Sequence, residues 1–521
     1  MSEETWEVRE RNLWSLNLMP VRGTRERLEP LDSIQPILEA AIMSGMRGVF
    51  LDTETLDKLF EIAGISNQMT SGARTIASVN ENEISPAPRP HGLAHYDLAA
   101  FPMEARDVDM ELEVHFDITG NSITEGRMSD ILSCFNDRLS TIRKMLIDSR
   151  TLPYRPTQIG EVSMNKPRYR EEDCSLIGIV NSPTYTKKGG HLRFTLEDEG
   201  AEIECIMYNR PEFGDEHPLR TGMMPDDVIG VTGRLKSERG RRDTFNVEEI
   251  HFPPLNEHKK NSAPADQAIS VAFLSDVHLG SKTFLDAQWH KMVEWFNTDP
   301  LAKTIRYFVI SGDGVDGVGI YPNQEKELAI PDLFNQYGGL AKLLEPLPDW
   351  VDVLLLPGNH DAVRPAEPQP ALDLELQQDY NNTTFVGNPC DFSLHGVRIL
   401  SYHGKSIDDF VAKMRSVSYD RPEAAMRAMI DRRHLAPSWG AKTPLSPEPE
   451  DNLVIRTIPD IFVTGHVHGH HVSDYKGVKL IHSSTWQDQT GYQRTLGFQP
   501  RPAILTVVNL HTHETASIPF A

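Results

Sequence analysis

Apolar residues recur at helical spacing in three segments of the first 150 residues. The spacing predicts helices over residues 31–41, 55–62 and 128–146, and the last of these is amphipathic along its whole length. The polar tract between the second and third segments is rich in proline and lacks periodicity, which is typical of a linker. We therefore expect a helical N-terminal module (1–75), a flexible linker (76–104), and a connecting strand followed by an amphipathic helix (105–150).

Short runs of alternating apolar and polar residues follow, separated by turns that contain glycine and proline. They predict five strands, over residues 175–180, 191–196, 201–207, 228–235 and 244–250. Five short strands in so short a stretch are typical of a small barrel of the OB type, which we place at residues 151–256. The turn before the last strand carries Arg239, Arg241 and Arg242. These side chains could contact the phosphates of a single strand, or they could simply be solvated at a hairpin tip. The barrel could also serve to dock a partner.

After a second linker at residues 257–268, the pattern changes to that of an α/β domain over residues 269–521. Runs of β-branched residues alternate with helical segments, and the runs are almost continuously apolar, as in strands that are buried on both faces. They predict strands over residues 271–275, 307–311, 351–356, 397–402, 461–464 and 478–481. The predicted fold class is therefore a multidomain chain that combines α/β and β domains.

Each of the first five of these strands is followed by a cluster of residues that can bind metal ions. The clusters are Asp276-Val277-His278, Gly312-Asp313, Gly358-Asn359-His360-Asp361, His403-Gly404 and Gly465-His466-Val467-His468. Because active sites of open α/β sheets lie at the carboxyl ends of strands, we expect the clusters to converge on one crevice. In Asp-x-His and His-x-His, alternate side chains of an extended segment would point to the same side, and the glycines would allow close approach of the backbone.

These clusters provide enough donors for two divalent metal ions. Apart from His360 and Asp361, they offer two carboxylates, one amide oxygen and four imidazoles. A pair of metal ions bridged by one carboxylate needs a set of this kind. Mixed imidazole and carboxylate ligands favour manganese, iron or zinc over magnesium, and we expect manganese.

Composition narrows the functional classes further. The chain has 75 acidic and 52 basic residues, a net charge of −23, so contact with nucleic acid has to be local rather than through bulk charge; the acidic excess would also serve solubility alone. No run of about 18 uncharged apolar residues and no signal-peptide layout is present, so we expect no membrane insertion and a cytoplasmic location. The four cysteines are scattered singly, which argues against a disulfide framework, a zinc finger or an iron–sulfur cluster.

The order of the five clusters resembles the calcineurin-like metallophosphoesterase superfamily. Within it, the segments FLSDVHLGSKTF, SGDGVDGVGIYPNQEKELAI, PGNHDAVRPAEPQPAL, RRHLAPSWGAKTPL and TGHVHGH are similar to the small subunits of archaeal family D DNA polymerases. The resemblance implies a C-terminal β-sandwich flanked by helices, preceded by an OB-type barrel and a helical module. It also implies a separate large subunit that polymerises, and 3′-to-5′ proofreading hydrolysis of single-stranded or mispaired DNA ends by the small subunit.

The resemblance implies roles for individual residues as well. Asp276, His278 and His468 would hold the first metal ion, Asn359, His403 and His466 the second, and Asp313 would bridge both. His360 would stabilise the charge on the phosphate and protonate the departing 3′ oxygen. Asp361 would orient His360 or simply cap the loop. Protein phosphatases of the superfamily carry an arginine after the GDxVD motif, whereas here Asp316 is followed by Gly317, which disfavours that activity.

Other basic residues of this domain are candidates for contacts with the DNA strand: Arg364, Lys405, Arg432, Arg433 and His434. The last four could equally pack as helix ends and ion pairs. Two other functions stay open. The chain could be a purely structural polymerase subunit, which the complete set of ligand-competent residues disfavours, or a metallophosphodiesterase of small substrates, which the OB-like domain disfavours. The chain has no polymerase motif, so synthesis would belong to the large subunit.

Overall fold

The computed structural model describes most of the chain, and the described residues are 9, 12–13, 18–20, 28, 31, 33–44, 49–51, 53–63, 104–237, 243–255, 260–495 and 499–521. The described part of the N-terminal module contains the helices α3 (Gln35–Ser44) and α4 (Thr53–Ile62) and a pair of short parallel strands, β1 (Leu18–Pro20) and β2 (Val49–Leu51). Both predicted helices are present and pack their apolar faces into one small core. The strands, of three residues each, are too short to show a pattern in the sequence.

A closed five-stranded barrel follows, with strand order β4-β5-β6-β8-β7. Its strands are β4 (Cys174–Tyr185), β5 (Leu192–Glu197), β6 (Glu202–Met207), β7 (Val228–Lys236) and β8 (Thr244–His251). Short helices α6 (Ile159–Met164), α7 (Lys166–Glu171) and α8 (Pro218–Thr221) accompany them. All five predicted strands are present. Buried residues alternate with more exposed ones along β5 and β6, because one face of each strand lines the barrel core.

The C-terminal domain is a sandwich of two six-stranded sheets. The first sheet contains β12 (Thr383–Phe385), β11 (Asp352–Leu356), β10 (Ile305–Ser311), β9 (Ser270–Leu274), β18 (Ile504–Asn509) and β19 (Thr515–Pro519), in that order. The second contains β16 (His471–Tyr475), β17 (Val478–His482), β15 (Ile461–Thr464), β14 (Val397–Ser401), β13 (Cys390–Leu394) and β3 (Leu112–Phe116). All six predicted strands of this domain are present, and the predicted connecting strand, β3, forms an edge of the second sheet.

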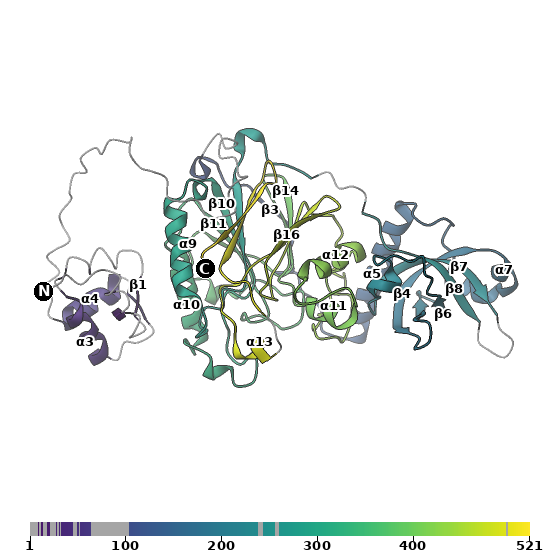
Figure 1. Ribbon diagram of the computed structural model, residues 1–521, viewed down its shortest axis with the longest axis horizontal. Helices are drawn as coiled ribbons and strands as arrows, with labels where there is room; N and C mark the ends of the chain where they lie inside the picture. The colour runs from purple at the N-terminus through teal and green to yellow at the C-terminus, as the bar shows by residue number, and fades with distance from the viewer. Residues whose placement is uncertain are drawn as a thin grey trace.

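Helices cover both outer faces of the sandwich (Figure 1). On the first sheet lie α9 (Asp286–Thr298) and α10 (Leu333–Leu344), and on the second α11 (Ile407–Lys413) and α12 (Pro422–Arg432); α13 (Gly491–Thr495) lies near the metal-ligand candidates described below. One apolar core fills the space between the sheets, and a further core lies under each pair of helices. The central strands β9, β10, β11, β14, β15 and β17 are almost continuously apolar because both of their faces are buried.

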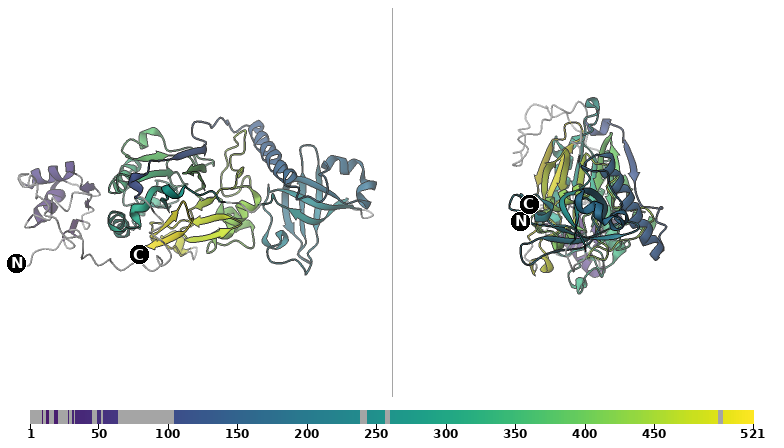
Figure 2. Two further views of the ribbon diagram at one scale, coloured as in Figure 1. Left: turned by 90° about the horizontal axis from the view of Figure 1, so that it is seen from above. Right: turned by 90° about the vertical axis from the view of Figure 1, so that its right-hand side faces the viewer.

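The long helix α5 (Met128–Asp148) joins the barrel to the sandwich (Figure 2). Leu139, Ile142 and Leu146 on one side of the helix pack against the barrel. Arg138 is buried and donates from Nε to Asp451 Oδ2 of the sandwich domain at 2.6 Å. None of the helices in the part of the chain with described coordinates is long and apolar enough to span a membrane. The four cysteines are buried and form no disulfide.

Two of the basic residues considered for DNA contacts belong to this junction. Arg432, at the end of α12, is buried and donates to Asp227 of the barrel at 3.1 Å. His434 is buried with its Nε2 atom 3.0 Å from Asp451 Oδ2. Arg432 is thus buried in an ion pair, whereas burial lowers the pKa of His434 and makes its contact with Asp451 a hydrogen bond. Both contacts favour the structural interpretation of these side chains over contact with a DNA strand.

We predict that Arg138→Leu lowers the free energy of unfolding by about 3–5 kcal/mol, because it leaves the buried Asp451 carboxylate without its guanidinium partner. The matched control is Arg143→Leu on the same helix, which removes a more exposed pair with Glu199 and should change stability by less than about 1 kcal/mol. Urea denaturation measures both. The double variant Arg138→Leu/Asp451→Leu should recover part of the loss, whereas equal stability of Arg138→Leu and Arg143→Leu would contradict a structural role for the buried pair.

Candidate metal centre

The five polar clusters meet at one edge of the sandwich. In the first sheet β9, β10 and β11 run parallel, and in the second β14 runs parallel to β15, so that strands of each sheet end together. Among the described residues, three groups have ligand atoms within 4.8 Å of one another. These groups are Asp276, His278 and His468; His278, Asp313 and His360; and Asp313, His403 and His466. The predicted convergence of the clusters is therefore present.

The backbone at these positions is unusual. Asp276, His278, Asp313, His466 and His468 all have positive φ, between 51° and 76°. The prediction that Asp-x-His and His-x-His present their side chains from an extended segment is wrong, since the left-handed region replaces the extended one at both residues of each pair. For residues other than glycine this conformation costs about 1–3 kcal/mol each and persists only where the surrounding structure imposes it.

Glycines let the strand ends approach one another. A Cβ atom on Gly358 would lie 2.2 Å from Asp313 Oδ1, and one on Gly465 would lie 1.9 Å from Ser275 Oγ. Gly312 has a φ of +96°, and its Cβ would lie 2.4 Å from His403 Nδ1. Any larger residue at these positions would displace the candidate ligands, which explains why glycine precedes Asp313, Asn359 and His466.

The first group of donors lies between β9 and β15. The Nε2 atoms of His278 and His468 are 3.0 Å apart, and His468 Nε2 is 3.4 Å from Asp276 Oδ1. The other ring nitrogen of His278, Nδ1, is 3.0 Å from the buried Asp316 carboxylate, which fixes the ring. Such an outer carboxylate commonly orients a metal-binding histidine.

The second group lies around Asp313. His403 Nε2 is 3.2 Å from both Asp313 Oδ2 and Asn359 Oδ1. His403 Nδ1 lies 3.0 Å from the main-chain carbonyl oxygen of Ser311, which can only accept, so Nδ1 carries a proton. His466 also belongs to this group. Its Nε2 atom is 3.4 Å from Oδ2 of Asp408, which supports the ring.

His360 faces the same cleft from the loop after β11. Its main-chain N–H donates to Asp313 Oδ1 at 2.8 Å, and its Nδ1 donates to the carbonyl oxygen of Asp316 at 2.8 Å. Only Nε2 is then left for a ligand. The contacts of Asp361 are those of a loop cap: it accepts from the Gly358 N–H at 2.8 Å and from the Tyr337 hydroxyl at 3.1 Å. The main chain of Asp316, rather than Asp361, holds the His360 ring.

Electrostatics at the centre favours the protonated form of His278 and His403, whereas burial lowers the pKa of His360 and His466. Burial alone would lower the pKa of His403, but the Asp313 carboxylate outweighs burial and raises the pKa to about 9. For His278, burial is likewise outweighed, by Asp276, Asp316 and Asp313, and its pKa rises to about 10. Burial would raise the pKa of Asp313, yet the neighbouring histidines hold it well below its ordinary value.

The donor set fits a pair of divalent cations. When His403 is neutral, its Nε2 lone pair and the oxygens of Asp313 and Asn359 are three acceptors that face one another. Asp276 Oδ1 is buried and accepts no hydrogen bond, although His468 Nε2 lies 3.4 Å away, and a buried carboxylate oxygen without a hydrogen bond is unfavourable. A cation at each of the two groups would satisfy these atoms, and Asp313 lies where it could contribute to both.

A cleft of about 680 Å³ opens over this centre. Besides the candidate ligands, it is lined by the aromatic residues Tyr321 and Tyr419 and by Lys405 and Lys442. Lys405 is the one predicted DNA-contact residue among those lining the cleft, where it pairs with Asp408 at 2.9 Å. The side chains thus present positive charge and apolar surface beside the metal-ligand candidates.

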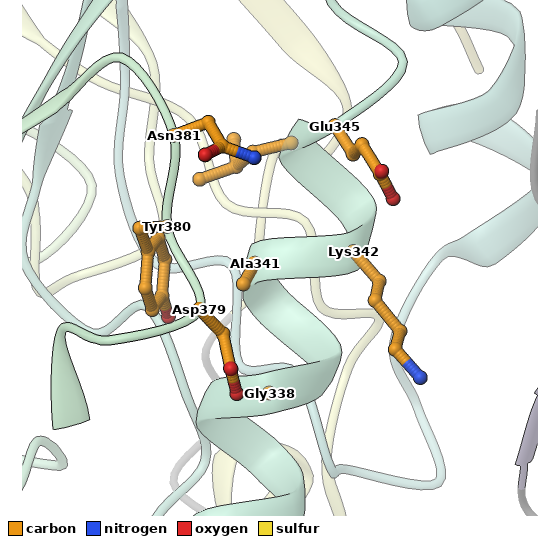
Figure 3. Close-up of a pocket in the computed structure, with 8 residues that line it drawn as sticks. Gly338, Ala341, Lys342, Glu345, Asp379, Tyr380 and Asn381 are labelled. Carbon is orange, nitrogen blue, oxygen red and sulfur yellow. The ribbon is translucent and has the colours of Figure 1, made fainter. Parts of the chain in front are cut away.

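A separate cavity of about 430 Å³ lies against α10 (Figure 3). The segment 379–381 forms its other wall, and Lys342 and Glu345 point away from that segment (Figure 3). It contains no imidazole and shares no residue with the cleft over the metal-ligand candidates. Of these two cavities, only the larger cleft is lined by candidate metal ligands.

The other predicted DNA-contact residues lie elsewhere. Arg364 donates to the Pro368 carbonyl oxygen and pairs with the buried Glu448 at 3.1 Å, which ties it to a neighbouring loop. Arg433 donates to the Ile455 carbonyl oxygen at 3.2 Å, and burial lowers its pKa to about 10. Arg239, Arg241 and Arg242 lie outside the described residues.

Several residues of the centre have no clear signal in the sequence. Gln487 donates to Asp316 Oδ1 at 3.2 Å, and Gln493 donates to His468 Nδ1 at 2.8 Å. Both come from the segment after β17, which has no recognisable motif. Asp408 stands in the first turn of α11, where an acidic residue is ordinarily explained by the helix dipole. In the sequence, only its spacing from Asp313 (Asp313-x-x-Asp316) indicates that Asp316 belongs to the centre.

Two family models match the chain. The model for the B subunits of DNA polymerases alpha and epsilon matches residues 271–472, and a model for an OB-fold nucleic acid binding domain matches residues 174–252. A solved structure described as a novel archaeal phosphodiesterase is similar over 48% of this chain and 99% of its own, with 13% identity and a TM-score of 0.25, too low to indicate a shared fold.

Relatives of similar length match most of the chain. The DNA polymerase II small subunit of Archaeoglobus fulgidus is 35% identical over 484 residues, which cover 90% of this chain and 92% of the relative. That of Methanothermobacter thermautotrophicus is 38% identical over 415 residues, covering 77% and 82%. With this identity over nearly the full length, the chain belongs to the family of archaeal DNA polymerase II small subunits, the small subunits of family D polymerases.

Proposed function

We propose that this small subunit is a metal-dependent 3′-to-5′ exonuclease that removes nucleotides from single-stranded or mispaired DNA ends for a large polymerising subunit. The observation that carries the proposal is the meeting of three donor groups in one cleft, two of which contain Asp313: one with His278 and His360, and one with His403 and His466. Seven ligand-competent residues from five separate segments would not be expected to meet by chance in a purely structural subunit. The same feature argues against the scaffold-only alternative.

The protein holds and orients the reacting groups. The chemistry that a bound metal pair supplies is the neutralisation of phosphate charge and the activation of water as a nucleophile. Asp276, His278 and His468 would hold one ion, and Asn359, His403 and His466 the other, with Asp313 between them. Asp316, Asp408 and the Ser311 carbonyl oxygen fix the rings of these histidines, so that little reorganisation is needed when an ion binds. Manganese is the expected ion.

His360 would move the proton that the reaction requires. Its Nδ1–H is engaged by the Asp316 carbonyl oxygen, which leaves Nε2 directed to the cleft as the atom that can donate to the departing 3′ oxygen. In the protonated form the ring would also offset negative charge on the phosphate. Lys405 and Lys442 provide further positive charge in the cleft, which explains how a chain of net charge −23 could bind a polyanion locally.

A second candidate function is hydrolysis of small phosphodiesters. The cleft alone would accept such substrates, but membership of a polymerase subunit family and the OB-type barrel favour DNA. A trimming assay on a 5′-labelled single strand, with the full chain and Mn²⁺, distinguishes DNA hydrolysis from hydrolysis of small phosphodiesters. Stepwise shortening from the 3′ end with release of nucleoside 5′-monophosphates is expected, and hydrolysis of small diesters without any shortening of the strand would favour the alternative.

We predict that Asp313→Asn abolishes the tight binding of two Mn²⁺ ions. It removes charge from a carboxylate that lies in one donor group with His278, assigned to the first ion, and in another with His403 and His466, assigned to the second. Isothermal titration calorimetry should show two ions bound by the unaltered chain and at most one, weakly, by the variant. Trimming should fall at least about a hundredfold. The matched control Asp332→Asn changes an exposed helix cap outside the cleft and should leave both readouts unchanged. Two tightly bound ions in Asp313→Asn would contradict the shared role.

We predict a different outcome for His360→Ala. If His360 transfers a proton rather than holding an ion, the variant still binds two Mn²⁺ ions, while kcat for trimming falls about 10²–10⁴-fold. Calorimetry and single-turnover trimming measure the two effects separately. Loss of an ion from His360→Ala would show instead that His360 is a ligand, as its place in the group with His278 and Asp313 permits.

Removal of metal should have a reversible effect. A chelator is expected to stop trimming and to lower the thermal denaturation temperature, because ions that bind only the folded state stabilise it. Adding Mn²⁺ back should restore both. A denaturation temperature that does not respond to chelator or Mn²⁺ would argue against a metal centre in this cleft.

A further inference from the structure

The loop after Asp316 exposes apolar side chains, and two of its residues line the cleft. Val318 is 46% exposed and Ile320 is 39% exposed, although both are large hydrophobic residues. Ile320 and Tyr321 line the cleft, and the ring centroid of Tyr321 is 6.4 Å from that of His360. We call residues Val318, Ile320 and Tyr321 the apolar rim. None of these side chains has a part in binding metal or in proton transfer.

Two glutamines with no exposed surface hold the loop that carries the apolar rim. Gln336, on α10, accepts from the Gly317 N–H at 2.9 Å and donates to the Gly317 carbonyl oxygen at 3.1 Å. Gln324 accepts from the Ile320 N–H at 2.9 Å. A buried glutamine is stable only when its amide is satisfied, so these contacts fix the backbone of the loop. The apolar rim is therefore exposed in a loop conformation that these hydrogen bonds fix.

The same contacts tie the apolar rim to the metal-ligand candidates. Gln324 donates from Nε2 to the Asp316 carbonyl oxygen at 2.8 Å and to Asp316 Oδ2 at 3.2 Å. Asp316 in turn holds His278 through its carboxylate and His360 through its carbonyl oxygen. The position of the rim relative to His360 is thus set by direct hydrogen bonds.

The Tyr321 ring is fixed at its far end. Its hydroxyl donates to Glu327 Oε2 at 3.1 Å, which anchors the ring and leaves its apolar body at the cleft. An aromatic ring with its hydroxyl anchored and apolar neighbours beside it is a surface on which a planar group can stack.

We infer that the apolar rim is a nucleobase subsite that receives the 3′-terminal base of the strand, with Tyr321 as the stacking residue. The inference rests on the proposed exonuclease function for the identity of the strand end. Every base has an apolar face, and base–aromatic stacking does not depend on sequence, as trimming of any 3′ end requires. Phosphate groups would be held at the metal ions and lysines, and the sugar–base unit would then extend to the rim beside His360. Small phosphodiesters that lack a base would not stack on the rim and would not be bound more tightly because of it.

Equilibrium binding tests the inference without catalysis. The full chain with Mn²⁺ is titrated into a single strand whose 3′-terminal base is 2-aminopurine, whose fluorescence falls when it stacks. The last linkage of the strand is a phosphorothioate, which resists hydrolysis. We expect quenching with the unaltered chain and with Tyr321→Phe, which keeps the ring. With Tyr321→Leu we expect the quenching to disappear and the Kd to rise about tenfold. A strand ending in an abasic sugar should bind the unaltered chain and Tyr321→Leu equally.

The matched control is Phe334→Ser, which removes another exposed hydrophobic residue that does not line the cleft. It should leave quenching and Kd unchanged. Full quenching by Tyr321→Leu, or equal loss in Phe334→Ser, would overturn the inference. Loss of large-subunit binding by Tyr321→Leu with unaltered 2-aminopurine quenching would assign the rim to the partner subunit instead. Quenching that depends on Tyr321 in a chain that does not trim DNA would overturn the proposed hydrolysis and leave the subsite standing.

Discussion

The organisation of the cleft depends on one constraint: acceptor atoms from five segments are held facing one another in a buried place. Asp313 is central to it, since its carboxylate belongs to two of the three donor groups and accepts the main-chain N–H of His360. Such an arrangement is unfavourable unless positive charge compensates it. The pKa values of His278 and His403 are raised for the same reason, because the neighbouring carboxylates stabilise the protonated rings. Bound cations are the simplest compensation.

The rest of the fold serves to maintain this arrangement. Five of the candidate ligands adopt left-handed backbone conformations, which the two sheets and the glycines at their ends impose. Around them, Asp316 links ligands, the proton-transfer candidate and the apolar rim through direct hydrogen bonds. On the far side, the buried pairs of Arg138 and Arg432 attach the barrel and α5 to the sandwich. The site is rigid because its supports are buried and satisfied, and the proposed nuclease would need little rearrangement on binding substrate.

Much of this was accessible from the sequence because it is encoded locally. Strand ends followed by Asp, Asn or His are visible in the chain, and parallel strands bring such ends together, so the ligand candidates could be named. The left-handed backbone at Asp276 and His278 could not be predicted from the sequence, because packing rather than residue type imposes it. Gln487 and Asp408 were missed because their contacts with Asp316 and His466 join distant parts of the chain. The residues at 432–434 were ambiguous for the same reason: only tertiary structure distinguishes a buried ion pair from a surface cation.

The central claim is that Asp313 lies between two metal ions held by the residues of the two groups. Diffraction from crystals of the full chain grown with manganese, recorded at the manganese absorption edge, tests it most directly. The account predicts two anomalous peaks in the cleft, one beside Asp276, His278 and His468 and one beside Asn359, His403 and His466, with Asp313 contacting both. Crystals that take up manganese elsewhere, or that show no peak in this cleft, would contradict it.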